Sequence, residues 1–318
     1  MSFTEKILVT GGAGFIGSNI AEELIKQGAK VSIIDNFATG FRENLDEIQG
    51  AFDFIEGDLN DDKALVSAID GVDIVFHQAA LPSVPRSVAN PEETHQACVN
   101  ATFNLLCKAK DNNVKRLIYA ASSSAYGDQE TLPKVETMRP EPLSPYAAAK
   151  LMGEYYCQVF TNVYGLETIC LRYFNVFGPR QNPGSMYSGV ISRFIDALMS
   201  GENPQIYGDG EQSRDFTYIA NVVNANLQAA KTGKGIGQTM NAANGERISL
   251  NSLLEVLKRI TGKQNVSAVY FDERKGDVKH SQASNLLAKE FLNYEVLVDL
   301  EEGLRRTIDW WKTSRFAK

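Results

Sequence analysis

The first half of the chain alternates short apolar runs with amphipathic segments, and this alternation limits the available folds more than any other feature. The apolar runs predict five strands, at 6–10, 31–35, 52–56, 73–78 and 116–121. Helical patterns fall between most of these runs. Strands that alternate with helices form a parallel sheet covered on both faces and joined by right-handed crossovers. We therefore predict an α/β fold built on a doubly wound parallel sheet.

The second half of the chain is organised differently. A helix at 145–164 and a strand at 167–173 continue the alternation, but after Gly178 prolines and glycines divide the chain into shorter units. Two of these units, 216–232 and 238–241, still resemble elements of the main domain. We predict that the main domain covers 1–178 and regains 206–245, while 179–205 and 246–318 form a smaller, interleaved C-terminal substrate lobe.

Composition and charge exclude several classes of protein. The chain is 43% hydrophobic and 22% charged, as is usual for globular proteins, and its net charge of −7 argues against nonspecific nucleic-acid binding. No apolar signal region or bilayer-spanning stretch is apparent. Four cysteines occur without a CxxC pair, and three histidines without metal-site spacing. We predict a cytoplasmic protein with no membrane, nucleic-acid or metal partner.

The glycine-rich loop after the first strand is suited to a phosphate ligand. Gly11, Gly14 and Gly17 have the spacing GxxGxxG, not the GxGxxG of the standard dinucleotide fingerprint. Glycines allow a tight turn and a close approach of backbone to ligand, and the following helix N-terminus offers unpaired amides. The loop predicts binding of a dinucleotide pyrophosphate; the less favoured alternative, taking the loop in isolation, is a strand-helix turn without a ligand.

Residues at the ends of later strands support a dinucleotide. Asp35 lies about 20 residues beyond the loop, where a carboxylate can hydrogen-bond the adenosine ribose. Asn36 follows it with no adjacent arginine for a 2′-phosphate, which favours NAD over NADP, although Arg42 is near in sequence. Asp58, after the third strand, is either an adenine contact or a helix N-cap.

Two further segments are candidate cofactor contacts. Gln78, Ala79 and Ala80 follow the fourth strand, where small side chains permit either a ligand or close packing. Asn100 lies inside an apolar helix, where an amide usually needs a partner. That partner is either the cofactor or the backbone.

Tyr146 and Lys150 are the strongest candidate catalytic pair. Residues at i and i+4 share one face of a helix, so a phenol and an ammonium lie side by side. A free phenol ionises near pH 10, but the ammonium and a positive nicotinamide ring both lower its pKa. Such a tyrosine can take a proton from an alcohol while the nicotinamide takes hydride. Ser122, Ser123 and Ser124 leave the fifth strand where parallel sheets place ligands, and a hydroxyl there can stabilise the substrate proton.

Together the motifs resemble those of the extended short-chain dehydrogenase/reductase family, and within it the nucleotide-sugar 4-epimerases, over nearly the whole chain. The motifs are TGGAGFIGS, IIDNFATG, GDL, SSSAYG, SPYAAAK, RYFNVFGPRQNP, GDGEQSRDFTYI and RKGDVKHSQAS. The last three are the most specific, because they belong to the sugar-nucleotide site. The resemblance implies a Rossmann fold, NAD as cofactor and a UDP-sugar as substrate.

The resemblance also implies roles for individual residues. Ser122 joins Tyr146 and Lys150 in catalysis, while Ser123 and Ser124 face the substrate or support the loop. The implied cofactor contacts are Gly11, Gly14, Phe15, Ile16, Gly17, Asp35, Asn36, Gly40, Asp58, Leu59, Gln78, Ala79, Ala80, Asn100, Tyr146, Lys150 and Tyr173. The implied substrate contacts are Asn175, Arg214 and Arg274 at the diphosphate, Asp277 at a ribose hydroxyl or at Arg274, and Tyr207 at the uridine.

The implied mechanism has three parts. Tyr146 removes the O4 proton of the sugar while C4 gives hydride to NAD, which leaves a 4-keto sugar. This sugar rotates about the diphosphate linkage, and hydride and proton then return to its opposite face. Rotation requires a roomy sugar pocket and a firmly anchored nucleotide.

Three residues bear on the size of the sugar. Ser281 lies where many epimerases of the family carry a bulky residue, so it leaves room for an N-acetyl group, unless it is simply a surface serine. Ser83 and Gln181 also resemble the acetamido-preferring subgroup. We predict interconversion of UDP-N-acetylglucosamine (UDP-GlcNAc) and UDP-N-acetylgalactosamine (UDP-GalNAc), with UDP-glucose and UDP-galactose as a second pair.

Other activities share this fold and cofactor. Related 4,6-dehydratases need an acidic pair, and decarboxylases commonly a glutamate, where this chain has Ser123 and Ser124. A non-catalytic NAD-binding scaffold and a net dehydrogenase are further alternatives. The resemblance also implies a homodimer, in which helices at 90–112 and 145–164 of two subunits form a four-helix bundle.

Overall fold

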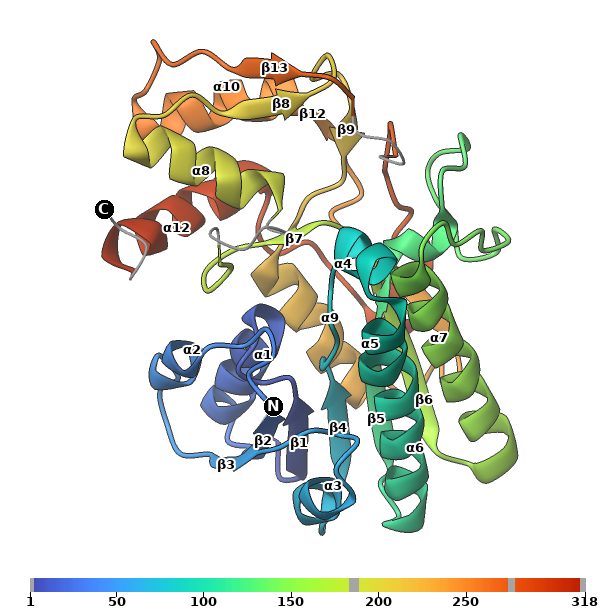
Figure 1. Cartoon of the computed structure of the whole chain (residues 1–318). Coiled ribbons are helices and arrows are strands. Elements are labelled where there is room, and N and C mark those ends of the chain that lie inside the picture. Colours follow the sequence, from blue (N-terminus) through green and yellow to red (C-terminus); the bar gives the residue numbers. More distant parts are fainter. Residues whose placement is uncertain (1–2, 183–188, 274–277, 315–318) are drawn as a thin grey trace.

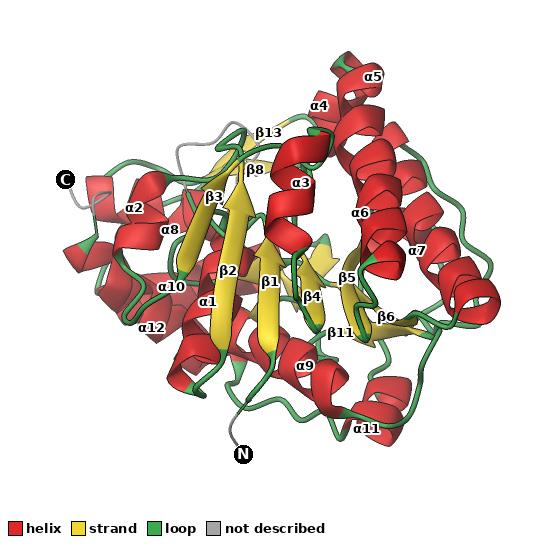
Figure 2. Ribbon diagram, turned by 90° about the horizontal axis from the view of Figure 1, so that it is seen from below, coloured by secondary structure: helices red, strands yellow, loops and turns green. Residues whose placement is uncertain are grey.

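The computed structural model describes residues 3–182, 189–273 and 278–314. Seven parallel strands form its central sheet, in the order β11-β6-β5-β4-β1-β2-β3 (Figure 2). They are β1 (Lys6–Thr10), β2 (Lys30–Asp35), β3 (Asp53–Glu56), β4 (Ile74–His77), β5 (Arg116–Ser122), β6 (Glu167–Tyr173) and β11 (Thr239–Ala242). The doubly wound α/β fold is confirmed, and the ends of the predicted strands agree to within one residue.

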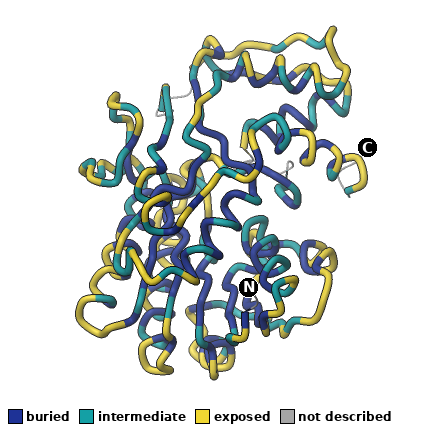
Figure 3. The backbone as a smooth tube through the Cα atoms, turned by 180° about the vertical axis from the view of Figure 1, so that it is seen from behind, coloured by how far each residue is buried: buried dark blue, intermediate teal, exposed yellow. Residues whose placement is uncertain are grey.

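Helices cover both faces of this sheet. Helices α1 (Phe15–Lys26) and α9 (Ile219–Lys231) pack together on one face, and α3 (Asp62–Ile69), α6 (Ala101–Asp111) and α7 (Pro145–Tyr164) cover the other (Figure 2). Apart from the edge strand β3, the strands between them are buried along most of their length (Figure 3), as expected for parallel strands between helical layers. Among the described residues, no helix has both the length and the apolar character that crossing a membrane requires.

A smaller part of the molecule lies beyond the carboxyl ends of the strands (Figure 1). Here β8 (Gln205–Tyr207) pairs with β13 (Val269–Phe271), and β9 (Ser213–Arg214) pairs with β12 (Ile248–Ser249). Its helices are α8 (Val190–Ser200), α10 (Leu250–Thr261) and α12 (Leu300–Thr313). The domain boundaries at 178, 205 and 245 stay a prediction.

The remaining elements are short. Strand β7 (Val176–Phe177) pairs with β10 (Thr217–Tyr218). The others are α2 (Arg42–Asp46), α4 (Val84–Ala89), α5 (Pro91–His95), a π-helical turn at Gln96–Asn100, a 3₁₀ turn at Ser123–Tyr126 and α11 (Leu286–Leu292). The π-helical turn joins α5 to α6, so that these three elements run on from one another.

Candidate active site

A cavity of about 790 Å³ lies at the carboxyl ends of the sheet strands. Because all seven strands are parallel, the residues that follow them meet at this one edge. The predicted site residues that line the cavity are Gly11, Gly14, Phe15, Ile16, Gly17, Asp35, Asn36, Asp58, Leu59, Gln78, Ala79, Ala80, Ser122, Ser123, Ser124, Tyr146, Lys150, Tyr173, Asn175 and Gln181. The structure thus brings most of the predicted cofactor and catalytic residues together.

The backbone of the glycine loop packs so closely against neighbouring backbone that a Cβ atom would not fit at Gly11 or Gly17. Gly11 has a φ of 68°, and a Cβ there would lie 2.7 Å from the backbone nitrogen of Ala79. A Cβ on Gly17 would lie 2.2 Å from the carbonyl oxygen of Gly11. Helix α1 begins after Gly14 without a side-chain cap, so its first amides remain available to a ligand. This loop fits the pyrophosphate of a dinucleotide.

Two carboxylates, those of Asp35 and Asp58, line the cavity. Asp35 accepts hydrogen bonds from the backbone amides of Ala13 (2.9 Å) and Phe37 (2.8 Å). Its burial raises the pKa of its carboxyl group, and these two bonds offset part of the rise. Asp58 accepts a hydrogen bond from the Asn36 side chain at 2.6 Å. The N-cap of α3 is Asp61, so Asp58 does not cap that helix.

Three residues considered for the cofactor do not line this cavity. A Cβ on Gly40 would lie 2.9 Å from the carbonyl carbon of Ala13, so this glycine permits close packing of the loop. The Asn100 amide donates to the Gln96 side chain at 2.6 Å, within the π-helical turn. Arg42 pairs with Glu56 of β3 at 2.9 Å.

The catalytic candidates lie on the first two turns of α7. Ser144 caps this helix by accepting from the Ala147 amide at 3.2 Å, which sets where Tyr146 and Lys150 lie. The Lys150 ammonium is buried and donates to the Ala120 carbonyl of β5 at 2.8 Å. Ser122 lies beside them, with its hydroxyl 2.8 Å from that of Ser124.

The protein alone does not lower the pKa of Tyr146, contrary to the direction predicted from Lys150. Burial raises the pKa of the Tyr146 phenol, and a hydrogen bond with Ser122 offsets only part of the rise. Burial also lowers the pKa of Lys150. Desolvation disfavours both charged forms, so a phenolate here requires a further positive charge.

A buried ion pair holds the catalytic helix against the sheet. Glu154 of α7 accepts from the Arg172 guanidinium of β6 at 2.9 and 2.7 Å, and both side chains are only 4% exposed. The Arg172 guanidinium also lies 4.6 Å from the centre of the Tyr126 ring. Tyr126 in turn donates to Asn241 of β11 at 2.7 Å. This network links α7, β6, the 3₁₀ turn at Ser123–Tyr126 and the edge strand β11.

A chain of side-chain hydrogen bonds centred on His77, at the end of β4, was not predicted from the sequence. The buried His77 ring lies 2.7 Å from the Thr10 hydroxyl through Nδ1 and 2.9 Å from the Thr102 hydroxyl through Nε2. Thr102 donates to the carbonyl of Cys98, so Nε2 carries the proton and Nδ1 accepts from Thr10. Burial and the Lys150 charge lower the pKa of His77 to about 3, which keeps the ring neutral. Cys98 itself packs in a small buried cluster with Tyr146.

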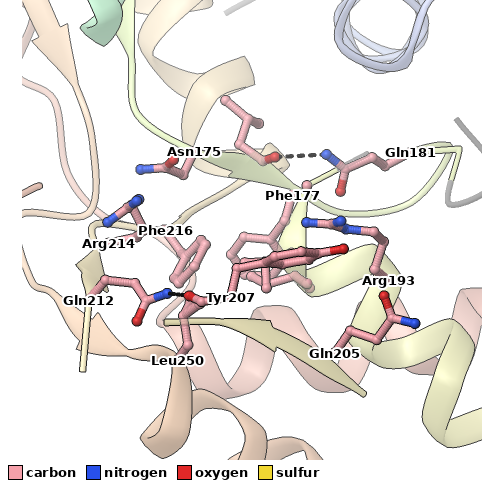
Figure 4. Close-up of a pocket in the computed structure, with 14 residues that line it drawn as sticks. Asn175, Phe177, Gln181, Arg193, Gln205, Tyr207, Gln212, Arg214, Phe216 and Leu250 are labelled. Atoms are coloured by element: carbon pink, nitrogen blue, oxygen red, sulfur yellow. Dashed lines mark hydrogen bonds between the residues drawn. The ribbon is translucent and has the colours of Figure 1, made fainter. Parts of the chain in front are cut away.

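A second cavity of about 250 Å³ adjoins the first (Figure 4). Asn175 and Gln181 line both cavities, so these two residues lie at the junction. Tyr207 and Arg214 line the second one, as does Arg193, which was not predicted. The Tyr207 ring stacks on Phe271 with 5.4 Å between centroids.

Two predicted substrate residues that the structure describes, Ser83 and Ser281, are not among those that line either cavity. The Ser83 hydroxyl caps α4 by accepting from the Arg86 amide at 3.0 Å. The Ser281 amide donates to the Ser213 carbonyl at 3.0 Å. Arg274 and Asp277 lie outside the described residues.

Comparison with known proteins shows likeness over the whole chain. Residues 7–243 match the NAD dependent epimerase/dehydratase family. The structure resembles that of UDP-N-acetylglucosamine 4-epimerase from Methanobrevibacter ruminantium in complex with UDP-N-acetylmuramic acid (TM-score 0.93, 41% identity, 98% of this chain and 99% of that one). It also resembles UDP-glucose 4-epimerase from Thermotoga maritima with UDP-glucose (0.92, 38%, 97% and 99%). A UDP-N-acetyl-alpha-D-glucosaminuronate decarboxylase from Bacillus cytotoxicus is 32% identical over 325 residues (97% of this chain, 98% of the decarboxylase).

Proposed function

The chain belongs to the NAD-dependent epimerase/dehydratase family, and within it we propose that the protein is a UDP-hexose 4-epimerase. Its preferred pair is UDP-GlcNAc and UDP-GalNAc, with UDP-glucose and UDP-galactose as a second pair. The observation that carries this proposal is one cavity holding Tyr146, Lys150 and three serines, with no carboxylate at 123 or 124. The similarity to a UDP-N-acetylglucosamine 4-epimerase supports the acetamido preference.

The proposed chemistry divides among a few residues. Gly11, Gly17 and the first turn of α1 hold the NAD pyrophosphate, and Asp35 holds the ribose. Bound NAD supplies the hydride acceptor and donor for C4, and a positive ring that favours the phenolate of Tyr146. Tyr146 takes the O4 proton and later returns it. Lys150, fixed by the Ala120 carbonyl, keeps the adjacent charge in place.

The decarboxylase among the relatives makes loss of a carboxyl group the main alternative. Decarboxylation and 4,6-elimination both begin with the same oxidation at C4 but then need an acidic residue near the sugar. Ser123 and Ser124 stand where related enzymes carry those residues, and both line the cavity. A hydroxyl does not replace a carboxylate as a general base at neutral pH, which favours epimerisation.

Incubation with UDP-GlcNAc and with UDP-glucose, followed by chromatographic identification of products, tests the proposal. We expect UDP-GalNAc from the first substrate at the higher rate, and no accumulation of reduced cofactor. Incubation with a UDP-uronic acid serves as the comparison. Release of carbon dioxide and a UDP-pentose would assign the protein to the decarboxylases instead, and NAD binding without any conversion would favour a scaffold.

Ser281 provides a test of the acetamido preference. Replacing Ser281 with tyrosine adds volume where the resemblance places the C2 substituent. We expect the ratio of kcat/KM for UDP-glucose over UDP-GlcNAc to rise by about tenfold. Ser267→Tyr, on an exposed loop outside both cavities, is the matched control. Equal losses for both substrates in Ser281→Tyr would show that this residue does not select the sugar.

We also propose that the protein is a homodimer in which α6 and α7 pack against the same helices of a second copy. The described apolar residues Met152, Tyr155, Val159 and Val163 recur along one face of α7 and are 45%, 54%, 47% and 65% exposed. Phe103 of α6 is also 40% exposed beside this face. A continuous apolar surface of this kind is typical of an interface.

Replacing Val159 with glutamate tests the dimer. A charge buried at the proposed interface would be unpaired and desolvated, so light scattering should show the mass of a monomer. Val66→Glu, at a residue of α3 that is 45% exposed, is the control and should leave the mass unchanged. A dimer that survives the Val159 change would place the interface elsewhere.

A further inference from the structure

We propose that Arg193 is a ligand of the substrate diphosphate, acting across the smaller cavity from Arg214. This inference rests on the proposed function, because it takes a UDP-sugar as the occupant of that cavity. It adds a positively charged residue that no motif in the sequence marks. Figure 4 shows Arg193 and Arg214 on opposite sides of the cavity, with Tyr207 and Phe216 between them.

The position of Arg193 on its helix directs it towards the cavity. Arg193 is the fourth residue of α8, and helical side chains point back towards the N-terminus. The first residues of this helix, Val190 and Ile191, line the same cavity, together with Gly189 before them. The guanidinium therefore adds its charge to the positive end of the helix dipole.

The first turn of α8 is held in place by Gln181. The Ser192 hydroxyl donates to the Gln181 side-chain oxygen at 2.8 Å, and the Gln181 nitrogen donates to the Val176 carbonyl of β7 at 3.0 Å. A fixed helix presents Arg193 at a fixed position, so the residue loses little further freedom when a ligand binds.

The charge of the cavity favours an anion. Its described lining includes Arg193 and Arg214 but neither aspartate nor glutamate, although the whole chain carries a net charge of −7. One guanidinium nitrogen of Arg214 already donates to the carbonyls of Ser213 (3.0 Å) and Lys279 (3.1 Å). A diphosphate has more oxygen atoms than the remaining donors of Arg214 can serve. The Arg193 guanidinium supplies further paired donors, beside those of Asn175 and of Arg274, which the resemblance also places at the diphosphate.

The test compares Arg193→Gln with the unaltered full-length protein for binding of UDP and of uridine. Calorimetry measures UDP, and an NMR titration, which detects weak binding, measures uridine. We expect the Kd for UDP to rise by about 10- to 100-fold, as for loss of a charge-assisted hydrogen bond, and the Kd for uridine to stay unchanged. Arg193→Lys keeps the charge but not the paired donors, so its Kd for UDP should lie between the values for the unaltered protein and for Arg193→Gln.

Controls separate the proposal from misfolding and from the proposed function. Arg259→Gln removes the same charge from an exposed site on α10 and should leave UDP binding unchanged, and NAD binding should persist in every variant. An unchanged Kd for UDP in Arg193→Gln, or an equal loss for uridine, would overturn the assignment to the diphosphate. UDP binding that depends on Arg193 in a protein without epimerase activity would reject the function and keep this inference. Epimerase activity together with UDP binding that does not depend on Arg193 would keep the proposed function and reject this inference.

Discussion

Replacing Tyr146 with phenylalanine should lower kcat for epimerisation by about 10²- to 10⁴-fold, because it removes the group that accepts and returns the O4 proton. The change deletes one oxygen atom and keeps the ring, which packs with Cys98, Val99 and Ala149 in a buried cluster. Helix α7 should therefore keep its place, and NAD should stay bound. The measurement is steady-state turnover of UDP-GlcNAc, with the content of bound NAD determined on the same sample.

A tyrosine at the other end of the same helix provides the control. Tyr164 is 54% exposed at the C-terminal end of α7, and Tyr164→Phe makes the same chemical change far from the cavity. We expect its kcat to equal that of the unaltered protein. Near-normal turnover in Tyr146→Phe would reject Tyr146 as the proton acceptor, and Ser122 would then be the next hydroxyl to test.

Replacing Glu154 with alanine should lower the free energy of unfolding by about 3–5 kcal/mol, the usual effect of removing one partner from a buried ion pair. The change leaves the Arg172 guanidinium charged and buried on β6, with its bonds to Glu154 lost. The Tyr126 ring still lies beside the guanidinium, but a neutral ring does not replace the lost carboxylate. Chemical denaturation followed by circular dichroism gives the free energy of unfolding.

A pair on α10 whose carboxylate is exposed is the matched comparison. Glu255 is 65% exposed and pairs with Lys258 at 2.9 Å, so Glu255→Ala should cost about 0–1 kcal/mol. An equally small loss in Glu154→Ala would mean that water reaches Arg172 and that the pair does not hold α7 to the sheet.

The sheet and the cofactor loop could be predicted from the sequence because their signals are local. Most strands of the sheet are apolar runs with turn residues near their ends, and the glycines of the loop are adjacent to the first strand. The strands of the smaller part, such as β9 and β12, have two residues each. A segment of two residues is too short to show a hydrophobic periodicity. Pairing with a neighbouring segment, not its own sequence, makes it a strand.

The site residues that were missed depend on contacts between distant segments. His77 is tied to Thr10 and Thr102, which lie 67 and 25 positions away, so only the fold shows that the ring is neutral and structural. Arg193 could have been found as a basic residue in the first turns of a helix that follows a glycine, but many surface helices share that pattern. Burial has the larger effect on Tyr146, since it reverses the pKa shift that the spacing of Tyr146 and Lys150 predicts.

The place of β11 at the edge of the sheet has a consequence for synthesis. This strand pairs with β6, yet more than sixty residues of chain, including α8 and α9, separate the two in sequence. One edge of β6 pairs with β5, which is made earlier, but the hydrogen-bonding groups on the edge that faces β11 have no strand partner until residue 242 has left the ribosome. We expect the nascent chain to need protection from aggregation during that interval, and a fragment that stops after β6 to be insoluble.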